Sequence, residues 1–226
     1  MLTLYQFESC PFCWKVKALL HYAKIPYTAV EVNPMNQKEL AHLNLNKVPV
    51  LADSDKIVTE SSVIMDYIDT HYAHLPAGDE SVAVWRGWVD DTLVHFLPPI
   101  VHKDFATSWQ TFGQVLKPSG YGVFKRLLVR FAGAIAMSRV AQKKARERGI
   151  TDAPAALKAA VDRWVDEGLT GRFFHGGEQP DLADLSLFGV FRSTDGLSAV
   201  QLACDHNPAF AAWYAQLKSM TASTAL

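Results

Sequence analysis

The stretch that decides the fold is Glu8-Ser9-Cys10-Pro11-Phe12-Cys13, which joins an apolar segment to an amphipathic one. Before it, Leu2 to Phe7 is apolar and aromatic, a composition that predicts a buried strand. Pro11 suits the first position of a helix, because its missing N–H would be unpaired there in any case. Apolar residues then recur at helical spacing, with Lys15 and Lys17 on the opposite face. The sequence therefore predicts a C-x-x-C pair at the start of a helix that follows a strand.

This placement makes Cys10 the candidate catalytic nucleophile. Unpaired N–H groups and the helix dipole stabilise a thiolate at a helix N-terminus, so the pKa of the thiol falls. Cys13 lies one turn deeper on the same face, where it either resolves a mixed disulfide or takes no part. The alternative is a zinc site, which needs two further ligands at matching spacing. Only Cys204 and scattered histidines remain, so we expect no metal.

The following residues predict an α/β order over about the first 72 positions. Alternating residues from Tyr27 to Val32 predict a second strand, parallel to the first and reached through the helix. A short helix is expected at Asn36 to Leu43, and two short strands at Val48 to Leu51 and Lys56 to Thr59. Glu60-Ser61-Ser62 then opens a further helix.

The character of the chain changes after a linker at His74 to Asp79. From Glu80 onward the periodicity is helical and strand patterns are almost lacking. We therefore expect a first domain over residues 1–74 and an all-helical second domain over residues 80–226. Its expected helices lie at about 80–101, 120–147, 153–168, 182–192 and 207–219.

Two further features are candidate ligand contacts. Val48-Pro49 begins a strand; in the cis form the backbone of Val48 would face a peptide-like ligand, whereas otherwise Pro49 is an edge-strand residue. Ser61 at a helix N-terminus can offer its hydroxyl and backbone N–H to a carboxylate, and Glu60 can accept an ammonium group. The alternative for Glu60-Ser61 is a plain N-cap.

Composition narrows the class of protein. Hydrophobic residues make up 49% of the 226 positions and charged residues 20%, which suits a folded core and argues against disorder. A net charge of −1 provides no general attraction for nucleic acid. Tyr121 to Val140 is interrupted by arginine and lysine, so we expect an amphipathic helix there rather than a membrane span. We expect a cytoplasmic protein without a membrane anchor.

Taken together, these motifs resemble the glutathione transferase superfamily over nearly the whole chain. The resemblance is carried by residues 10–13, by Lys47-Val48-Pro49-Val50-Leu51, by Glu60-Ser61-Ser62 and by the Gly177–Asp184 loop. Asp181 and Asp184 stand where the family has a capping box. The resemblance implies a thioredoxin-like, glutaredoxin-like N-terminal domain that binds glutathione, an all-helical C-terminal domain and a homodimer.

Carried over residue by residue, the resemblance assigns roles to seven positions. Cys10 would be the catalytic thiol, with Cys13 as its possible partner. Val48, with Pro49, would pair with the cysteinyl backbone of glutathione, and Phe12 would pack against its sulfur. Glu60 and Ser61 would hold the γ-glutamyl end. A small hydrophobic or disulfide substrate would lie between the domains; Trp85, Trp88 and Phe96 either line that pocket or belong to the core.

The resemblance implies a glutathione-dependent transferase or thiol-disulfide reductase. Within the superfamily the motifs are most similar to the prostaglandin E synthase type 2-like branch, which implies an alternative, an isomerase acting on a peroxide lipid. The chain departs from that branch at Phe7, where a tyrosine is expected, and at Glu60, where an aspartate is expected. A non-catalytic module that binds glutathione or haem is a third hypothesis.

Overall fold

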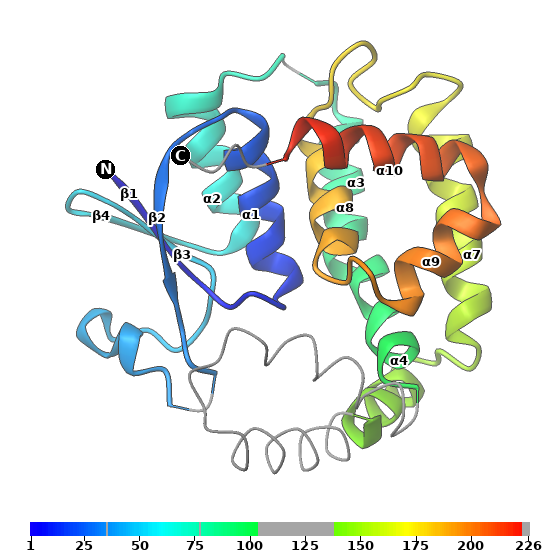
Figure 1. Ribbon diagram of the computed structural model, residues 1–226, viewed down its shortest axis with the longest axis horizontal. Coiled ribbons are helices and arrows are strands. Elements are labelled where there is room, and N and C mark those ends of the chain that lie inside the picture. Colours follow the sequence, from blue (N-terminus) through cyan, green and yellow to red (C-terminus); the bar gives the residue numbers. More distant parts are fainter. Residues whose placement is uncertain (35, 77, 104–137, 223–226) are drawn as a thin grey trace.

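The first part of the chain forms a four-stranded sheet (Figure 1). The computed structural model describes residues 1–34, 36–76, 78–103 and 138–222. The strand order is β2-β1-β3-β4, with β1 parallel to β2 and antiparallel to β3, and β3 antiparallel to β4. This is the predicted thioredoxin-like arrangement. The strands are β1 (Leu2–Gln6), β2 (Tyr27–Glu31), β3 (Val50–Asp53) and β4 (Lys56–Thr59).

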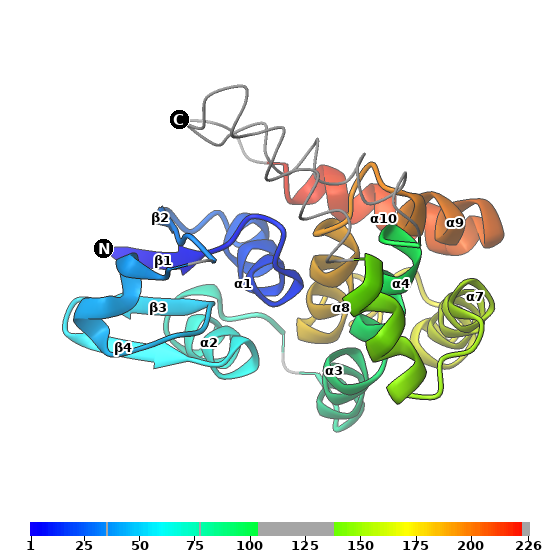
Figure 2. The same cartoon turned by 90° about the horizontal axis from the view of Figure 1, so that it is seen from below.

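Two helices, α1 (Pro11–Tyr22) and α2 (Ser61–Ile68), lie between the sheet and the helical part of the protein (Figure 2). Their apolar residues join those of the sheet and of the C-terminal helices in one continuous core. A 3-10 helix, η1 (Lys38–Leu43), forms a second, smaller core by packing Leu40 with Val32 and Val50. The sheet thus packs with helical structure from three separate segments of the chain.

Two elements in this part begin two residues later than predicted. The strand expected from Val48 begins at Val50 and continues to Asp53. Proline has no N–H to donate to a ladder, which is consistent with pairing that starts only after Pro49. The helix expected from Asn36 is the 3-10 helix that starts at Lys38.

The second part is helical throughout the residues described after α2, apart from loops and one isolated β-bridge. The helix predicted at 80–101 is broken near Thr92 into three pieces, and Pro98 and Pro99 occupy the first turn of the last piece, where their missing N–H groups are tolerated. The prediction overlooked the helix α9 (Ser198–His206) altogether. Of the helix predicted at 120–147, only residues 138–147 are described, and they are helical. The helices are η2 (Asp69–Ala73), α3 (Ser81–Asp91), η3 (Leu93–His95), α4 (Leu97–Val101), α7 (Ala153–Arg163), η4 (Trp164–Leu169), α8 (Leu182–Arg192), α9 (Ser198–His206) and α10 (Pro208–Met220).

The face of α1 that carries Lys15 and Lys17 is not a free surface. Both lysines are buried: α8 packs against α1 at Lys15, and Lys17 pairs with Glu8 and lies over the Trp14 ring. Gly189 of α8 permits the close approach: a Cβ added there would lie 2.5 Å from the Cα atom of Lys15. The amphipathic pattern of α1 therefore indicated the helix correctly but not its surroundings.

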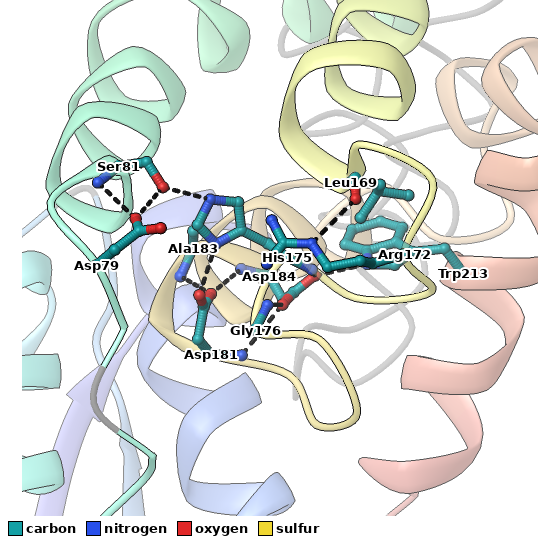
Figure 3. Close-up of polar contacts among 10 residues, drawn as sticks. All are labelled: Asp79, Ser81, Leu169, Arg172, His175, Gly176, Asp181, Ala183, Asp184 and Trp213. Carbon is teal, nitrogen blue, oxygen red and sulfur yellow. Dashed lines mark hydrogen bonds and ion pairs between the residues drawn. The ribbon is translucent and has the colours of Figure 1, made fainter.

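The N-terminus of α8 has the capping box that the sequence predicted. The Asp181 carboxylate accepts hydrogen bonds from the backbone N–H groups of Ala183 (2.8 Å) and Asp184 (3.1 Å), and the Asp184 carboxylate accepts one from the N–H of Asp181 (3.1 Å). Asp184 also accepts from the backbone of His175 and Gly176 and from Trp213 Nε1 (2.9 Å) (Figure 3). Two carboxylates thus satisfy the start of a buried helix.

The same network reaches the start of α3. His175 Nδ1 lies 2.6 Å from Asp181 Oδ2, and its Nε2 lies 2.8 Å from Ser81 Oγ. Burial opposes protonation of His175, but the hydrogen bond and charge of Asp181 outweigh it and raise the pKa of the imidazole. Burial and the charge of Asp181 raise the pKa of Asp184 to about 6. The loop before α8 is thereby tied to both helices.

Within the described residues, none of the helices has the length and apolar character needed to cross a bilayer. Most of the expected amphipathic helix at 121–140 lies outside the described residues.

Candidate active site

The Cys10–Cys13 pair lies at the start of α1, as the sequence predicted. Cys10 is the N-cap residue, Pro11 is the first residue of the helix, and Cys13 has no exposed surface. Cys10 is half-buried, and both thiols are free. The pair therefore presents one thiol at the helix end and a second one beneath it.

The two thiols have opposite pKa shifts. The pKa of Cys10 is lowered to about 7, first by a hydrogen bond from the Cys13 thiol and then by the backbone N–H groups of Cys13 and Phe12, while burial opposes the change. The pKa of Cys13 is raised, because its proton is held toward Cys10 and because it is buried. At neutral pH a large part of Cys10 is thiolate and Cys13 keeps its proton, so Cys10 is the better nucleophile.

The segment that leads to Cys10 is held by contacts that sequence reasoning did not find. The N–H of Cys10 donates to the carbonyl oxygen of Phe7 (2.9 Å), and Trp14 Nε1 donates to the carbonyl oxygen of Glu8 (2.6 Å). Lys17 pairs with the Glu8 carboxylate at 2.7 Å and lies over the Trp14 ring, with its Nζ atom 3.7 Å from the ring centroid. These contacts fix the turn between β1 and α1.

A cavity of about 540 Å³ opens beside this turn, between the first part of the chain and α3. All five residues that the resemblance implied as glutathione contacts line it. Cys10 and Cys13 are not among its described lining residues, although Phe12, which lies between them in the sequence, is. The described lining residues are Phe12, Leu45, Asn46, Lys47, Val48, Pro49, Thr59, Glu60, Ser61, Ser62, Asp90 and Asp91.

Of the two forms considered for Val48-Pro49, the structure has the cis peptide bond. Both residues line the cavity, at the end of the loop that leads into β3. Contact of Val48 with a peptide-like ligand stays a prediction.

Glu60 and Ser61 form the start of α2 and face the same cavity. Glu60 is the N-cap residue, yet its side chain does not hydrogen-bond the first turn, and its φ of 65° with ψ of 121° lies outside the regions that non-glycine residues usually occupy. The plain N-cap alternative therefore does not describe this pair. A backbone held in such a conformation is a feature that gathers at functional sites.

The wall that α3 contributes to the cavity differs from the expected one. It consists of Asp90 and Asp91, whereas Trp85, Trp88 and Phe96 are absent from the described lining. Trp85 is almost fully buried and packs edge-on against Trp88, with ring centroids 5.2 Å apart. Of the two alternatives for these aromatic residues, Trp85 belongs to the core. The carboxylates were not found from sequence, because nothing local distinguishes them from solvent-facing residues.

Comparison with known proteins agrees with this fold. The N-terminal domain model of glutathione S-transferases matches residues 4–77, and the C-terminal domain model matches residues 143–216. Prostaglandin E synthase 2 of Mus musculus is 29% identical, over 96% of this chain and 69% of that protein. The Danio rerio protein of the same name is 28% identical, over 97% of this chain and 71% of the relative.

Among solved structures, human glutathione transferase theta-2, in complex with glutathione and an unknown ligand, superposes with a TM-score of 0.64. The match covers 99% of this chain and 83% of the other, at 22% identity. At that identity the likeness concerns the fold alone.

Proposed function

We propose that this chain, which belongs to the glutathione S-transferase family, binds glutathione in the cavity beside α2 and uses the Cys10 thiolate to reduce mixed disulfides. The observation that carries this proposal is the place of Cys10 as the N-cap residue of α1, two residues before Phe12 of the cavity wall. There Cys13 and the helix end lower the pKa of the Cys10 thiol to about 7. A thiolate populated at neutral pH is what attack on a disulfide requires.

The reaction proceeds by two exchanges. The Cys10 thiolate attacks the glutathione sulfur of a mixed disulfide, forming Cys10–S–SG while the substrate leaves as a thiolate that takes up a proton. A second glutathione, as thiolate, then attacks the glutathione sulfur of this intermediate. Oxidised glutathione leaves and the Cys10 thiolate is restored. Alternatively Cys13 resolves the intermediate, releasing glutathione and leaving a Cys10–Cys13 disulfide that further glutathione reduces.

Glutathione is held, in this proposal, by the cavity residues. Ser61 offers its hydroxyl and backbone N–H to the γ-glutamyl carboxylate, and the Glu60 carboxylate accepts the ammonium group. The backbone of Val48, next to Pro49, pairs with the cysteinyl residue. Phe12 packs against the sulfur, between this site and Cys10. The support for this arrangement is that all five residues surround one cavity.

A second candidate activity is isomerisation of a peroxide lipid. It is favoured by one observation, that two relatives aligned over nearly the whole chain are named prostaglandin E synthase 2. Phe7 offers no hydroxyl where that branch is expected to carry a tyrosine, and this argues for the reductase. The two activities differ in stoichiometry, because reduction of a mixed disulfide of glutathione consumes one reduced glutathione and releases one oxidised glutathione, whereas isomerisation consumes none.

The proposal extends to organisation: domains over residues 1–74 and 80–226, a homodimer as is common in the family, and a cytoplasmic location.

The test is the pH dependence of Cys10 alkylation by iodoacetamide, followed peptide by peptide with mass spectrometry. We expect a midpoint near pH 7, with reactivity present above it and lost as the pH falls below it, since the thiolate is the reactive form. Glutathione should protect Cys10. Cys13→Ala should raise the midpoint toward about 8.5, because the donated hydrogen bond is removed.

Cys204 is an internal control, because burial raises the pKa of its thiol. Cys10→Ser should abolish reduction of the mixed disulfide of glutathione and 2-mercaptoethanol. A Cys10 thiol that titrates near 8.5 and is not protected by glutathione would instead indicate a non-catalytic module.

A further inference from the structure

A lysine with no exposed surface lies at the junction of three helices beside the cavity. Lys15 of α1 has its Nζ atom 2.6 and 2.8 Å from the two carboxylate oxygens of Asp90 in α3, and 3.0 Å from the hydroxyl oxygen of Ser62 in α2. Ser62 in turn donates to Asp90 Oδ2 at 2.9 Å. We call these three residues the Lys15 cluster. Burying an ammonium group is costly unless it is paired in this way.

A second contact from α3 holds the same turn of α2. Arg86 Nη2 donates to the carbonyl oxygen of Ser62 at 2.8 Å, and its Nη1 lies 2.6 Å from Asp66 Oδ1. Ser62 is therefore held through both its hydroxyl and its carbonyl group by residues of α3. The position of the first turn of α2 depends on where α3 lies.

The Lys15 cluster adjoins the proposed glutathione site. Ser62 follows Glu60 and Ser61 directly, and both Ser62 and Asp90 line the cavity. The Asp90 side chain is 26% exposed, whereas Lys15 lies behind it, in the helix that Cys10 begins. The cluster thus joins the helix of the thiol, the helix of the proposed carboxylate site and a helix of the second domain.

Both Asp90 oxygens are occupied within the cluster, so its charge is compensated and does not repel an anionic ligand. We propose that Asp90 is a positioning residue: with Lys15 and Ser62, it sets the first turn of α2, so that Ser61 meets the γ-glutamyl carboxylate of glutathione while the ligand sulfur reaches Cys10. This inference rests on the proposed function and adds to it a dependence of glutathione binding on the junction with α3.

The experiment compares Asp90→Asn with wild type in the full chain. Glutathione affinity is measured by calorimetry, and KM for glutathione and kcat are measured with the mixed disulfide of glutathione and 2-mercaptoethanol. We expect Kd and KM to rise about tenfold while kcat changes less than twofold. Asp162→Asn is the matched control, because Asp162 is a paired carboxylate of the second domain that accepts from His206 and Asn207 and does not line the cavity.

Asp90→Asn leaves the Lys15 ammonium without its counter-charge, which can prevent folding. Ser62→Ala removes only a hydroxyl and keeps the ion pair, and it should raise KM about threefold with kcat unchanged.

Wild-type Kd and KM in folded Asp90→Asn and in Ser62→Ala, even with reduced thermal stability, would overturn the inference and leave the proposed function intact. If Asp90→Asn does not fold, Ser62→Ala alone decides between these results. Absence of glutathione binding by the wild-type protein would overturn both.

Discussion

The starts of α2 and α8 lead into the same core, yet their first turns have different partners. At α8, the Asp181 carboxylate accepts hydrogen bonds from two backbone N–H groups, and the Asp184 carboxylate accepts one from the N–H of Asp181. Asp184 has no exposed surface. At α2, Glu60 does not cap the first turn, holds a φ of 65° and lines a cavity with Ser61. A helix end satisfied by its own carboxylates is a structural element. One left open beside a cavity is suited to an anionic ligand.

Three variants test this difference between the helix starts. The largest effect is expected at α8, from Asp184→Asn. The substituted amide would place an N–H₂ group against N–H donors such as those of Gly176 and Asp181, and would remove a buried charge that they stabilise. We expect the free energy of unfolding to fall by about 3 kcal/mol. Urea unfolding followed by circular dichroism measures it.

Asp205→Asn is the control for this change, because Asp205 is exposed on α9 and accepts only from Gln201 among the bonds described. The control should unfold within about 0.5 kcal/mol of wild type. An equally small effect for Asp184→Asn would show that the capping box contributes little to stability.

At α2 we expect the opposite pattern: Ser61→Ala should change the affinity for glutathione rather than the free energy of unfolding. The variant loses a hydroxyl proposed to donate to the glutathione carboxylate, so Kd should rise about tenfold, while the unfolding free energy changes by less than about 1 kcal/mol. Calorimetry with reduced glutathione measures the affinity. Ser198→Ala is the matched control, because Ser198 is also the first residue of a helix without a side-chain cap. A large loss of stability without a change in Kd would place Ser61 among the structural residues.

The smallest effect is expected at a third helix start. Asn207 caps α10 by accepting from the N–H groups of Ala209 (3.0 Å) and Phe210 (3.2 Å). Asn207→Ala should lower the unfolding free energy by about 1 kcal/mol and leave glutathione affinity unchanged. The same urea and calorimetric measurements apply. A change in affinity here would mean that stability anywhere in the second domain, rather than the open end of α2, controls binding.

Much of the fold followed from local patterns. Alternation from Tyr27 predicted β2, the range Lys56–Thr59 was predicted at its observed bounds, and the spacing of Asp181 and Asp184 predicted a capping box that the structure confirms. These succeeded because hydrogen-bond partners within a turn or a strand are set by short sequence spacing. Helix α9 was not predicted. Its buried residues are mostly small, so they gave only a weak local pattern.

The candidate site likewise has residues that local sequence patterns identified and residues that only the structure revealed. Cys10 was identified from its position between a strand and a helix, because a helix N-terminus acts on the residue that begins it. That Cys13 lowers the pKa of Cys10 while its own pKa is raised followed only from the structure. The carboxylates of Asp90 and Asp91 had no local signature, and the aromatic residue Trp85, expected as a possible pocket residue, is in the core.

By itself, then, the amino-acid sequence determined a cysteine pair at a helix start, the strand and helix order around it and the capped start of α8. Tertiary structure alone decided that Lys15 is buried, that it meets Ser62 and Asp90 from 47 and 75 positions away, and that Glu60 holds its unusual backbone conformation. The physical reason is the separation along the chain between the residues that interact. A helix or a cap depends on neighbours within a few residues, whereas burial of a charge and the shape of a cavity depend on which distant helices pack together.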